Sequence, residues 1–125
     1  MSYNLFLDDF REPEDAFNHT NNQLYLIGWV IARNYDEFVK TVEERGIPEM
    51  ISFDHDLADE HYESQQEYSE YKEKTGYHCA KWFINYCIDN KKELPATILI
   101  HSMNVAGSLN IKSLFDTYNK YFKQI

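Results

Sequence analysis

The chain has 125 residues, a length that supports one hydrophobic core and predicts a single domain. Its 21 acidic and 12 basic side chains give a formal net charge of −9. This balance argues against a surface that holds duplex nucleic acid, because such binding depends on clustered Lys and Arg. The same charge is typical of an ordinary soluble protein and names no partner.

The N-terminal residues show neither a basic leader nor a long apolar run, so we expect a cytoplasmic protein with no membrane partner. Cys79 and Cys87 stand two helical turns apart, which makes a disulfide between them geometrically poor. Both thiols are therefore predicted to be free and buried. The oligomeric state is left open.

The first part of the chain predicts two strands separated by an irregular segment. Residues 3–7 form a short apolar run typical of a strand buried on both faces. Residues 11–22 contain a proline and three asparagines without an apolar stripe, which favours a loop or a single helical turn. A second strand is predicted over residues 28–33, and an earlier start at residue 24 stays open.

The middle of the chain predicts a helix and a third strand. Phe38 and Val42 follow helical spacing, and Gly46 ends that helix. Residues 50–53 are apolar and predict a strand. The polar, Tyr-rich insertion at about residues 59–74 is compatible with a mobile loop, a solvated helix or a lid.

The last part predicts a helix from Gly76 to about Ile88, a fourth strand over residues 97–100, and a final amphipathic helix through Ile111 and Phe122. Strands that alternate with helices call for a mainly parallel sheet covered on both faces. The predicted fold is an α/β three-layer sandwich of the flavodoxin-like type, with four strands in the order 2-1-3-4.

Three of the four predicted strands end in polar residues that can carry chemistry. The first is followed by Asp8, Asp9 and Arg11, the third by Asp54, His55 and Asp56, and the fourth by His101, Ser102 and Asn104. In parallel sheets, ligands bind beyond the carboxyl ends of the strands. The order 2-1-3-4 would make these three ends neighbours.

Carboxylates gathered this closely repel one another unless a cation lies among them. Oxygen ligands suit a hard divalent cation, so we predict a Mg²⁺ or Mn²⁺ site. Histidines exchange protons near neutral pH, as a general acid and base must. The candidate metal ligands are Asp8, Asp9, Asp54 and Asp56, and the candidate catalytic residues are His55, His101, Asp54 and Asp9.

A phosphate is expected to bind at the start of the last helix, where free backbone N–H groups point toward the same edge. The candidate substrate-binding residues are Arg11, Ser102, Asn104 and Gly107. Each has a structural alternative: Arg11 can pair with Glu12 or Asp15, and Asn104 with Gly107 can simply begin the helix. Tyr77 and Trp82 can stack on a base or lie in the core, and the core is favoured for Trp82.

The motifs resemble the cyclic-phosphate processing receiver domain family, a divergent branch of the receiver fold. The resemblance rests on residues 5–11 (Leu-Phe-Leu-Asp-Asp-Phe-Arg), residues 51–57 (Ile-Ser-Phe-Asp-His-Asp-Leu), residues 75–77 (Thr-Gly-Tyr) with Lys81 and Trp82, and residues 101–104 (His-Ser-Met-Asn) with Gly107. It implies a receiver-like core and a role in processing cyclic phosphates of nucleotide, ADP-ribose or RNA-end derivatives.

Two positions depart from the family pattern, with His78 in place of Asp and Val105 in place of Pro. They can alter metal preference or the rigidity of the phosphate loop. The chain offers no Lys after a fifth strand, which places a phosphorelay role below hydrolysis. We therefore expect a cyclic phosphoesterase whose partner is a small phosphorylated ligand of nucleotide type. The alternative is a non-catalytic module that binds a nucleotide or contacts a protein.

Overall fold

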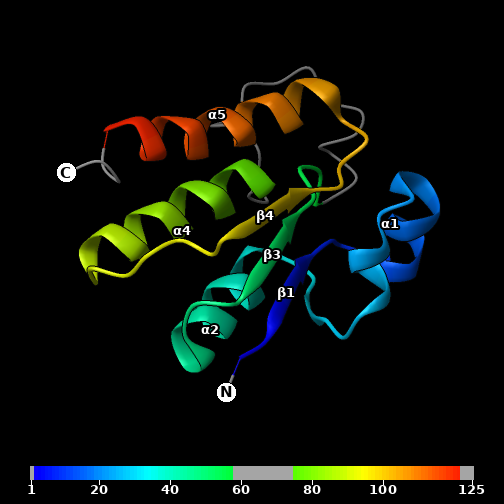
Figure 1. The fold of residues 1–125 in the computed structure, drawn as a ribbon, viewed down its shortest axis with the longest axis horizontal. Coiled ribbons are helices and arrows are strands. Elements are labelled where there is room, and N and C mark those ends of the chain that lie inside the picture. Colours follow the sequence, from blue (N-terminus) through cyan, green and yellow to red (C-terminus); the bar gives the residue numbers. More distant parts are fainter. Residues whose placement is uncertain (1, 58–74, 122–125) are drawn as a thin grey trace.

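The computed structural model describes residues 2–57 and 75–121, so the predicted insertion at 59–74 lies outside the described residues. Its centre is a four-stranded sheet in which every neighbouring pair of strands is parallel (Figure 1). The strand order is β2-β1-β3-β4, which confirms the predicted receiver-like topology. The strands are β1 (Asn4–Leu7), β2 (Val30–Ala32), β3 (Met50–Phe53) and β4 (Thr97–Ile100).

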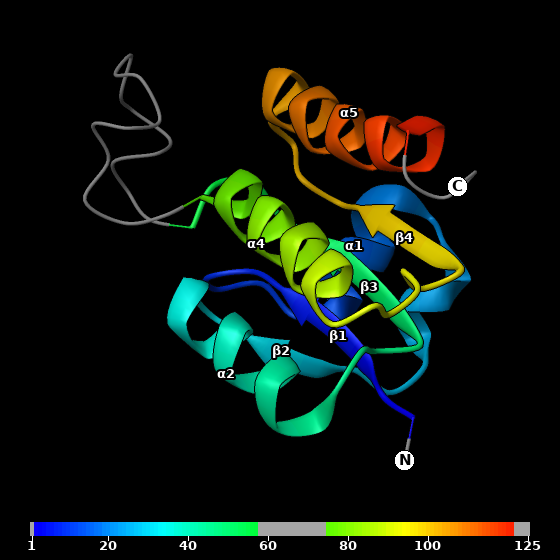
Figure 2. The ribbon, with the colours of Figure 1, turned by 90° about the vertical axis from the view of Figure 1, so that its left-hand side faces the viewer.

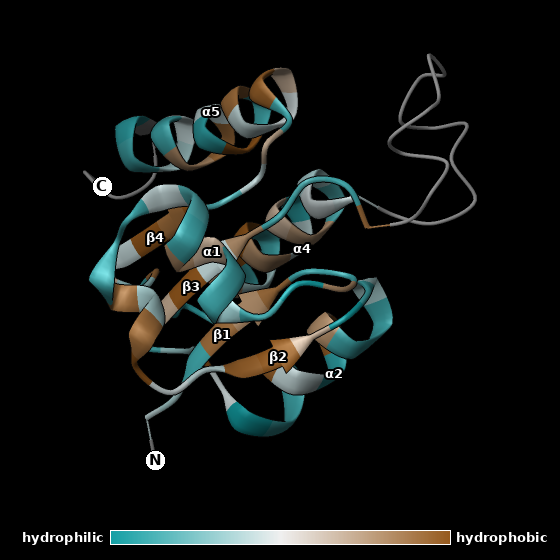
Figure 3. Cartoon of the chain, turned by 90° about the vertical axis from the view of Figure 1, so that its right-hand side faces the viewer, coloured by the Kyte–Doolittle hydropathy of each residue, from teal (hydrophilic) through white to brown (hydrophobic). Residues whose placement is uncertain are grey.

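The two faces of the sheet bury two separate cores. Leu5 and Leu7 of β1 point to the larger core, which also takes in residues of α2 (Tyr35–Arg45), α4 (Gly76–Asp89) and α5 (Val105–Tyr121). Phe6 points to the other face, where it packs with α1 (Pro13–Thr20). Figure 2 shows α4 and α1 on opposite sides of the sheet, and Figure 3 shows the apolar strands between more polar helices. Alternation along β1 thus produces the predicted three layers.

The helices begin and end at residues that cap them. The Asn34 side chain accepts a hydrogen bond from the Glu37 N–H at the start of α2, and Gly46 ends that helix with a φ of 89°. At the start of α4, the His78 side chain accepts from the backbone N–H of Thr75 at 2.9 Å. His78, one of the two residues that differ from the family pattern, therefore helps to cap α4.

One prediction for residues 11–27 was wrong, and one open alternative is decided. The segment expected to be a loop or a single helical turn forms the eight-residue helix α1. Glu12 and Asp15 make a reciprocal capping box there, and Pro13 occupies a first-turn position where its missing N–H costs nothing. The possible early start of β2 is instead a 3-10 helix, Gln23–Leu26, capped by Asn22. α1 is short and polar, so it carries almost no apolar periodicity to detect.

Cys79 and Cys87 are buried free thiols, as predicted. Within residues 2–57 and 75–121, no helix is both long enough and apolar enough to cross a membrane.

The junction between β3 and α4 depends on Gly76. Its N–H donates to the carbonyl of His55 at 2.7 Å, and a Cβ built at Gly76 would lie 1.7 Å from the carbonyl oxygen of Asp54. The obstructing atom is backbone, so the helix or the strand end must move to admit any side chain. Glycine is required here by close approach.

We predict that Gly76→Ala lowers the free energy of unfolding by at least ~2 kcal/mol, because the added methyl group overpacks two backbone segments. Gly28→Ala is the matched control, since nothing lies within 4 Å of a Cβ at Gly28. That control should stay within about 0.5 kcal/mol of the wild type. Urea denaturation of the three proteins makes the comparison, and equal midpoints would contradict the close approach.

Candidate active site

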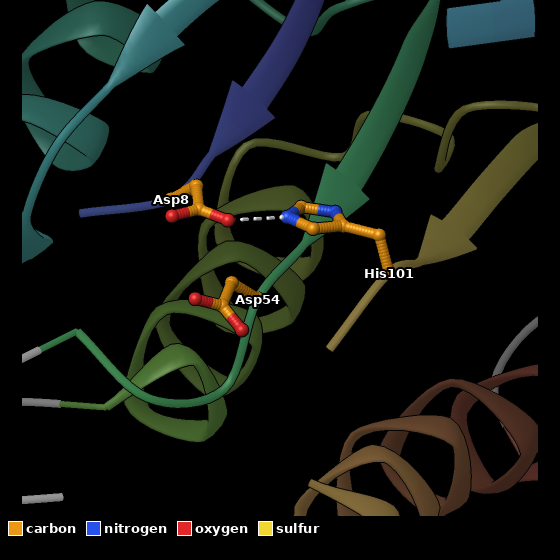
Figure 4. A group of neighbouring side chains, drawn as sticks. All are labelled: Asp8, Asp54 and His101. Atoms are coloured by element: carbon orange, nitrogen blue, oxygen red, sulfur yellow. Dashed lines mark hydrogen bonds and ion pairs between the residues drawn. The ribbon is translucent and has the colours of Figure 1, made fainter. Parts of the chain in front are cut away.

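The site begins where three strands end side by side. Leu7 pairs with Phe53, and Phe53 pairs with Ile100. The ladder continues one residue further, because the N–H of Asp54 donates to Leu7 and the N–H of His101 donates to Phe53, each at 3.0 Å. Asp8, Asp54 and His101 are therefore set next to one another by strand register (Figure 4).

These three side chains form a compact, buried group. Asp8 is 0%, Asp54 3% and His101 2% exposed. Each offers one ligand atom, and these atoms lie within 4.8 Å of one another. Nε2 of His101 and Oδ2 of Asp8 are 3.1 Å apart, the contact marked in Figure 4.

The two buried carboxyl groups have opposite electrostatic environments. Burial raises the pKa of Asp8, but hydrogen bonds from His101 and from the backbone of Arg11 and Phe10 outweigh it, so the pKa lies below its usual value. For Asp54, burial and then the charge of Asp8 raise the pKa to about 8. Without a cation, Asp8 is ionised at neutral pH while Asp54 favours its protonated form.

Asp54 also has an oxygen that nothing in the described part of the chain satisfies. Its Oδ1 accepts from the N–H of His55 at 2.9 Å, whereas the buried Oδ2 has no hydrogen-bond partner among the described residues. A buried acceptor of this kind is costly unless it binds a ligand. A hard cation between Asp8 and Asp54 would satisfy it, so these residues fit the predicted Mg²⁺ or Mn²⁺.

The other two predicted metal ligands, Asp9 and Asp56, are not members of this group, and His101 takes part instead. Asp9 is half-buried at the edge of the site, where its charge helps to raise the pKa of Asp54. Asp56 pairs with His55, whose Nδ1 lies 2.8 Å from Oδ1 of Asp56.

His55 is held by the start of α5. Asn104 caps this helix by accepting from the N–H of Gly107 at 2.8 Å, and its Nδ2 donates to Oδ1 of Asp56 at 3.2 Å. A Cβ at Gly107 would lie 2.4 Å from the His55 ring. Asn104 and Gly107 thus begin the last helix and also position the Asp56–His55 pair, while their contact with a phosphate stays a prediction.

Four half-buried polar side chains follow the same strand ends as Asp8 and His101, and we call them the rim of the site: Asp9, Arg11, Ser102 and Asn104. The guanidinium of Arg11 lies over the Phe10 ring and donates to Sδ of Met103 at 3.3 Å. The alternative ion pair of Arg11 with Glu12 or Asp15 does not form, because Glu12 pairs with Arg33 at 2.7 Å. Among the described residues, no carboxylate pairs with Arg11.

His101 is engaged on both of its ring nitrogens. Its Nδ1 lies 2.7 Å from Oγ of Ser52, and that hydroxyl lies 2.7 Å from the hydroxyl of Tyr25. The imidazole stacks on Phe6 with ring centres 4.3 Å apart. Burial lowers the pKa of His101, although Asp8 opposes the shift.

Three residues with a part in the site were not singled out from the sequence: Tyr25, Ser52 and Arg33. Ser52 lies inside β3 and Tyr25 in a 3-10 helix, so neither stands at a strand end. Arg33 follows β2 and donates to the carbonyl of Arg11 at 2.6 Å, which holds the loop after β1. Because Arg33 stands directly after a strand, its position in the sequence could have identified it as a residue of the site. Trp82 packs beside the larger core, as favoured above.

The model of one protein family matches residues 3–117, and its description reads cyclic-phosphate processing Receiver domain. The matched range contains all three strand ends and the starts of α4 and α5. No curated protein and no solved structure gives a significant match.

The electrostatics of Asp54 predict an unusual pH dependence for the cation-free protein. Its folded-state pKa of about 8 lies above an unfolded value near 4, so its carboxyl progressively costs stability as pH rises through that window. Asp54→Asn should therefore be more stable than the wild type at pH 8 in chelator, by roughly a few kcal/mol, with little difference at pH 4. Urea denaturation at both pH values tests this; a pH-independent difference would contradict it. Asp116→Asn, on an exposed site of α5, is the control.

Proposed function

We propose that this chain, which belongs to the cyclic-phosphate processing receiver domain family, is a phosphoesterase that acts on a cyclic phosphate. The expected substrate class is a nucleotide, an ADP-ribose derivative or an RNA end that carries such a ring. The observation that carries the proposal is the convergence of Asp8, Asp54 and His101, together with a buried oxygen of Asp54 that no residue within 2–57 and 75–121 satisfies.

Asp8 and Asp54 are the residues that would hold a divalent cation, because they are adjacent, buried and supply oxygen atoms. When bound, Mg²⁺ or Mn²⁺ supplies charge that stabilises negative oxygens on phosphorus. Asp9 stands at the rim beside them and adds negative charge to the site. Asp56 is assigned to His55 instead, because their side chains are already paired.

We assign proton transfer to His55. In the reaction, a water oxygen bonds to phosphorus, the bond from phosphorus to one ring oxygen breaks, and a phosphomonoester results. His55 takes the proton from water and returns a proton to the departing oxygen. The contact of Nδ1 with Asp56 orients the ring for this role, with Nε2 as the reacting atom.

The sequence hypothesis gave His101 a share of the proton transfer. Both of its nitrogens contact buried groups, on Ser52 and Asp8, which supports a role behind Asp8 instead. The rim residues are better placed to meet the phosphate. Arg11 and Ser102 are half-buried, and the start of α5 offers backbone N–H groups there.

We predict that the purified protein hydrolyses at least one member of a panel of cyclic nucleotides and ADP-ribose cyclic phosphates when Mg²⁺ or Mn²⁺ is present. Phosphorus NMR should show a cyclic diester converted to a monoester. Excess chelator should abolish turnover, because Asp8 and Asp54 then lack their counter-ion. A panel member that binds tightly in calorimetry and stays uncleaved would instead support the non-catalytic binding module.

We predict further that His55→Gln lowers kcat by about 10²–10⁴-fold, the usual range for loss of a general acid or base. His19→Gln is the matched control, because His19 is exposed at the end of α1. Circular dichroism must show that both variants are folded. Wild-type kcat in folded His55→Gln would remove the proton-transfer role from this residue.

A further inference from the structure

We infer that Tyr25 and Ser52 fix His101 as a hydrogen-bond donor to Asp8, which makes His101 a positioning residue for the cation site and not one of its ligands. This inference rests on the proposed cation site. It concerns residues that lie behind the carboxylates, on the side of the sheet that α1 covers.

The four groups form one continuous buried chain. The hydroxyls of Tyr25 and Ser52 are 2.7 Å apart, Ser52 Oγ is 2.7 Å from Nδ1 of His101, and Nε2 is 3.1 Å from Oδ2 of Asp8. No member is more than 3% exposed. Water therefore does not compete for these bonds, and each hydrogen must find its acceptor within the chain.

Counting hydrogens fixes the direction of every bond. The Tyr25 hydroxyl has one hydrogen, and Ser52 is its only hydrogen-bond partner among the described residues. Tyr25 must therefore donate to Ser52. Ser52 then donates to Nδ1 of His101, so the imidazole hydrogen sits on Nε2 and points to Asp8.

The opposite arrangement leaves a buried hydrogen without an acceptor. If Nε2 bound a cation, or if the ring carried a second proton, Nδ1 would have to donate to Ser52. Ser52 would then donate to the Tyr25 oxygen, and the phenol hydrogen would have no acceptor in the described part of the chain. A buried donor left unpaired is costly, which favours the direction given above.

The chain determines what Asp8 offers to a cation. Its Oδ1 accepts from the backbone of Phe10 at 3.1 Å and of Arg11 at 2.9 Å, and its Oδ2 accepts from His101. A carboxylate has about four acceptor positions, so roughly one remains. His101 also stacks on Phe6, which fixes the plane of the ring. Asp8 is therefore held rigidly as a single ligand atom beside Asp54.

The first test observes the His101 imidazole directly. In protein labelled with ¹⁵N-histidine, long-range proton–nitrogen NMR spectra should show a neutral ring with its hydrogen on Nε2. The same pattern should persist when Mg²⁺ is added. A hydrogen on Nδ1, or loss of the Nε2 hydrogen on Mg²⁺ addition, would overturn the inference.

The second test removes the donors. Ser52→Ala should shift the Nδ1 resonance to that of a nitrogen without a hydrogen bond, and should weaken Mg²⁺ binding in calorimetry by about tenfold, as losses behind a metal ligand do. Tyr25→Phe should weaken Mg²⁺ binding by a smaller factor. This variant replaces Ser52→Ala in the test if Ser52→Ala does not fold. Unchanged Mg²⁺ affinity in folded Ser52→Ala, or in Tyr25→Phe when only that variant folds, would refute the positioning role.

Tyr3→Phe is the matched control, because it also deletes a tyrosine hydroxyl that makes a hydrogen bond, here to the carbonyl of Gly46 at 2.6 Å. It should leave the His101 spectrum and the Mg²⁺ affinity unchanged. These readouts need no substrate, so absence of turnover would count against the phosphoesterase alone. If no cation binds, the positioning role is refuted, whereas the position of the hydrogen in the cation-free protein still decides whether Tyr25 and Ser52 fix His101 as a donor to Asp8.

Discussion

The fold places two carboxyl groups next to each other in a buried position, and most features of the site follow from that constraint. The register of β1 with β3 sets Asp8 beside Asp54, where little solvent screens their charges. The protein distinguishes them by surrounding Asp8 with N–H donors, whereas one buried oxygen of Asp54 has no hydrogen-bond partner among the residues that the structure describes. One group is thereby kept ionised and the other poised to bind a cation.

The elements that sequence patterns predicted correctly are those that bury continuous or periodic apolar surface. β3, β4 and α2 show such patterns. The alternation of strands and helices predicted a parallel sheet, and the order 2-1-3-4 came with the receiver-like fold; the structure confirms both. α1 was missed because one buried residue, Ala16, and the half-buried Phe17 are all that its polar sequence presents to a core. Its stability depends on caps and on contacts with the 3-10 helix, which a short window of sequence does not reveal.

The site was predictable where residues stand directly after strands. Asp8, Asp54 and His101 were found that way. The contact of the Asn104 amide with Asp56, beside the Asp56–His55 pair, forms only in the folded chain and was not predicted. Ser52 looks like one more strand residue in the sequence. Its hydroxyl acquires a role because Tyr25 lies on one side of it and His101 on the other.

The register that aligns the strand ends also links ligand binding to the folding equilibrium. Asp8, Asp54 and His101 come from distant parts of the chain and meet only when β1, β3 and β4 have all paired. The unfolded chain has no comparable site, so a cation bound there would shift the balance toward the native state by mass action. The resistance of this protein to unfolding would then track the free concentration of that ion in its surroundings.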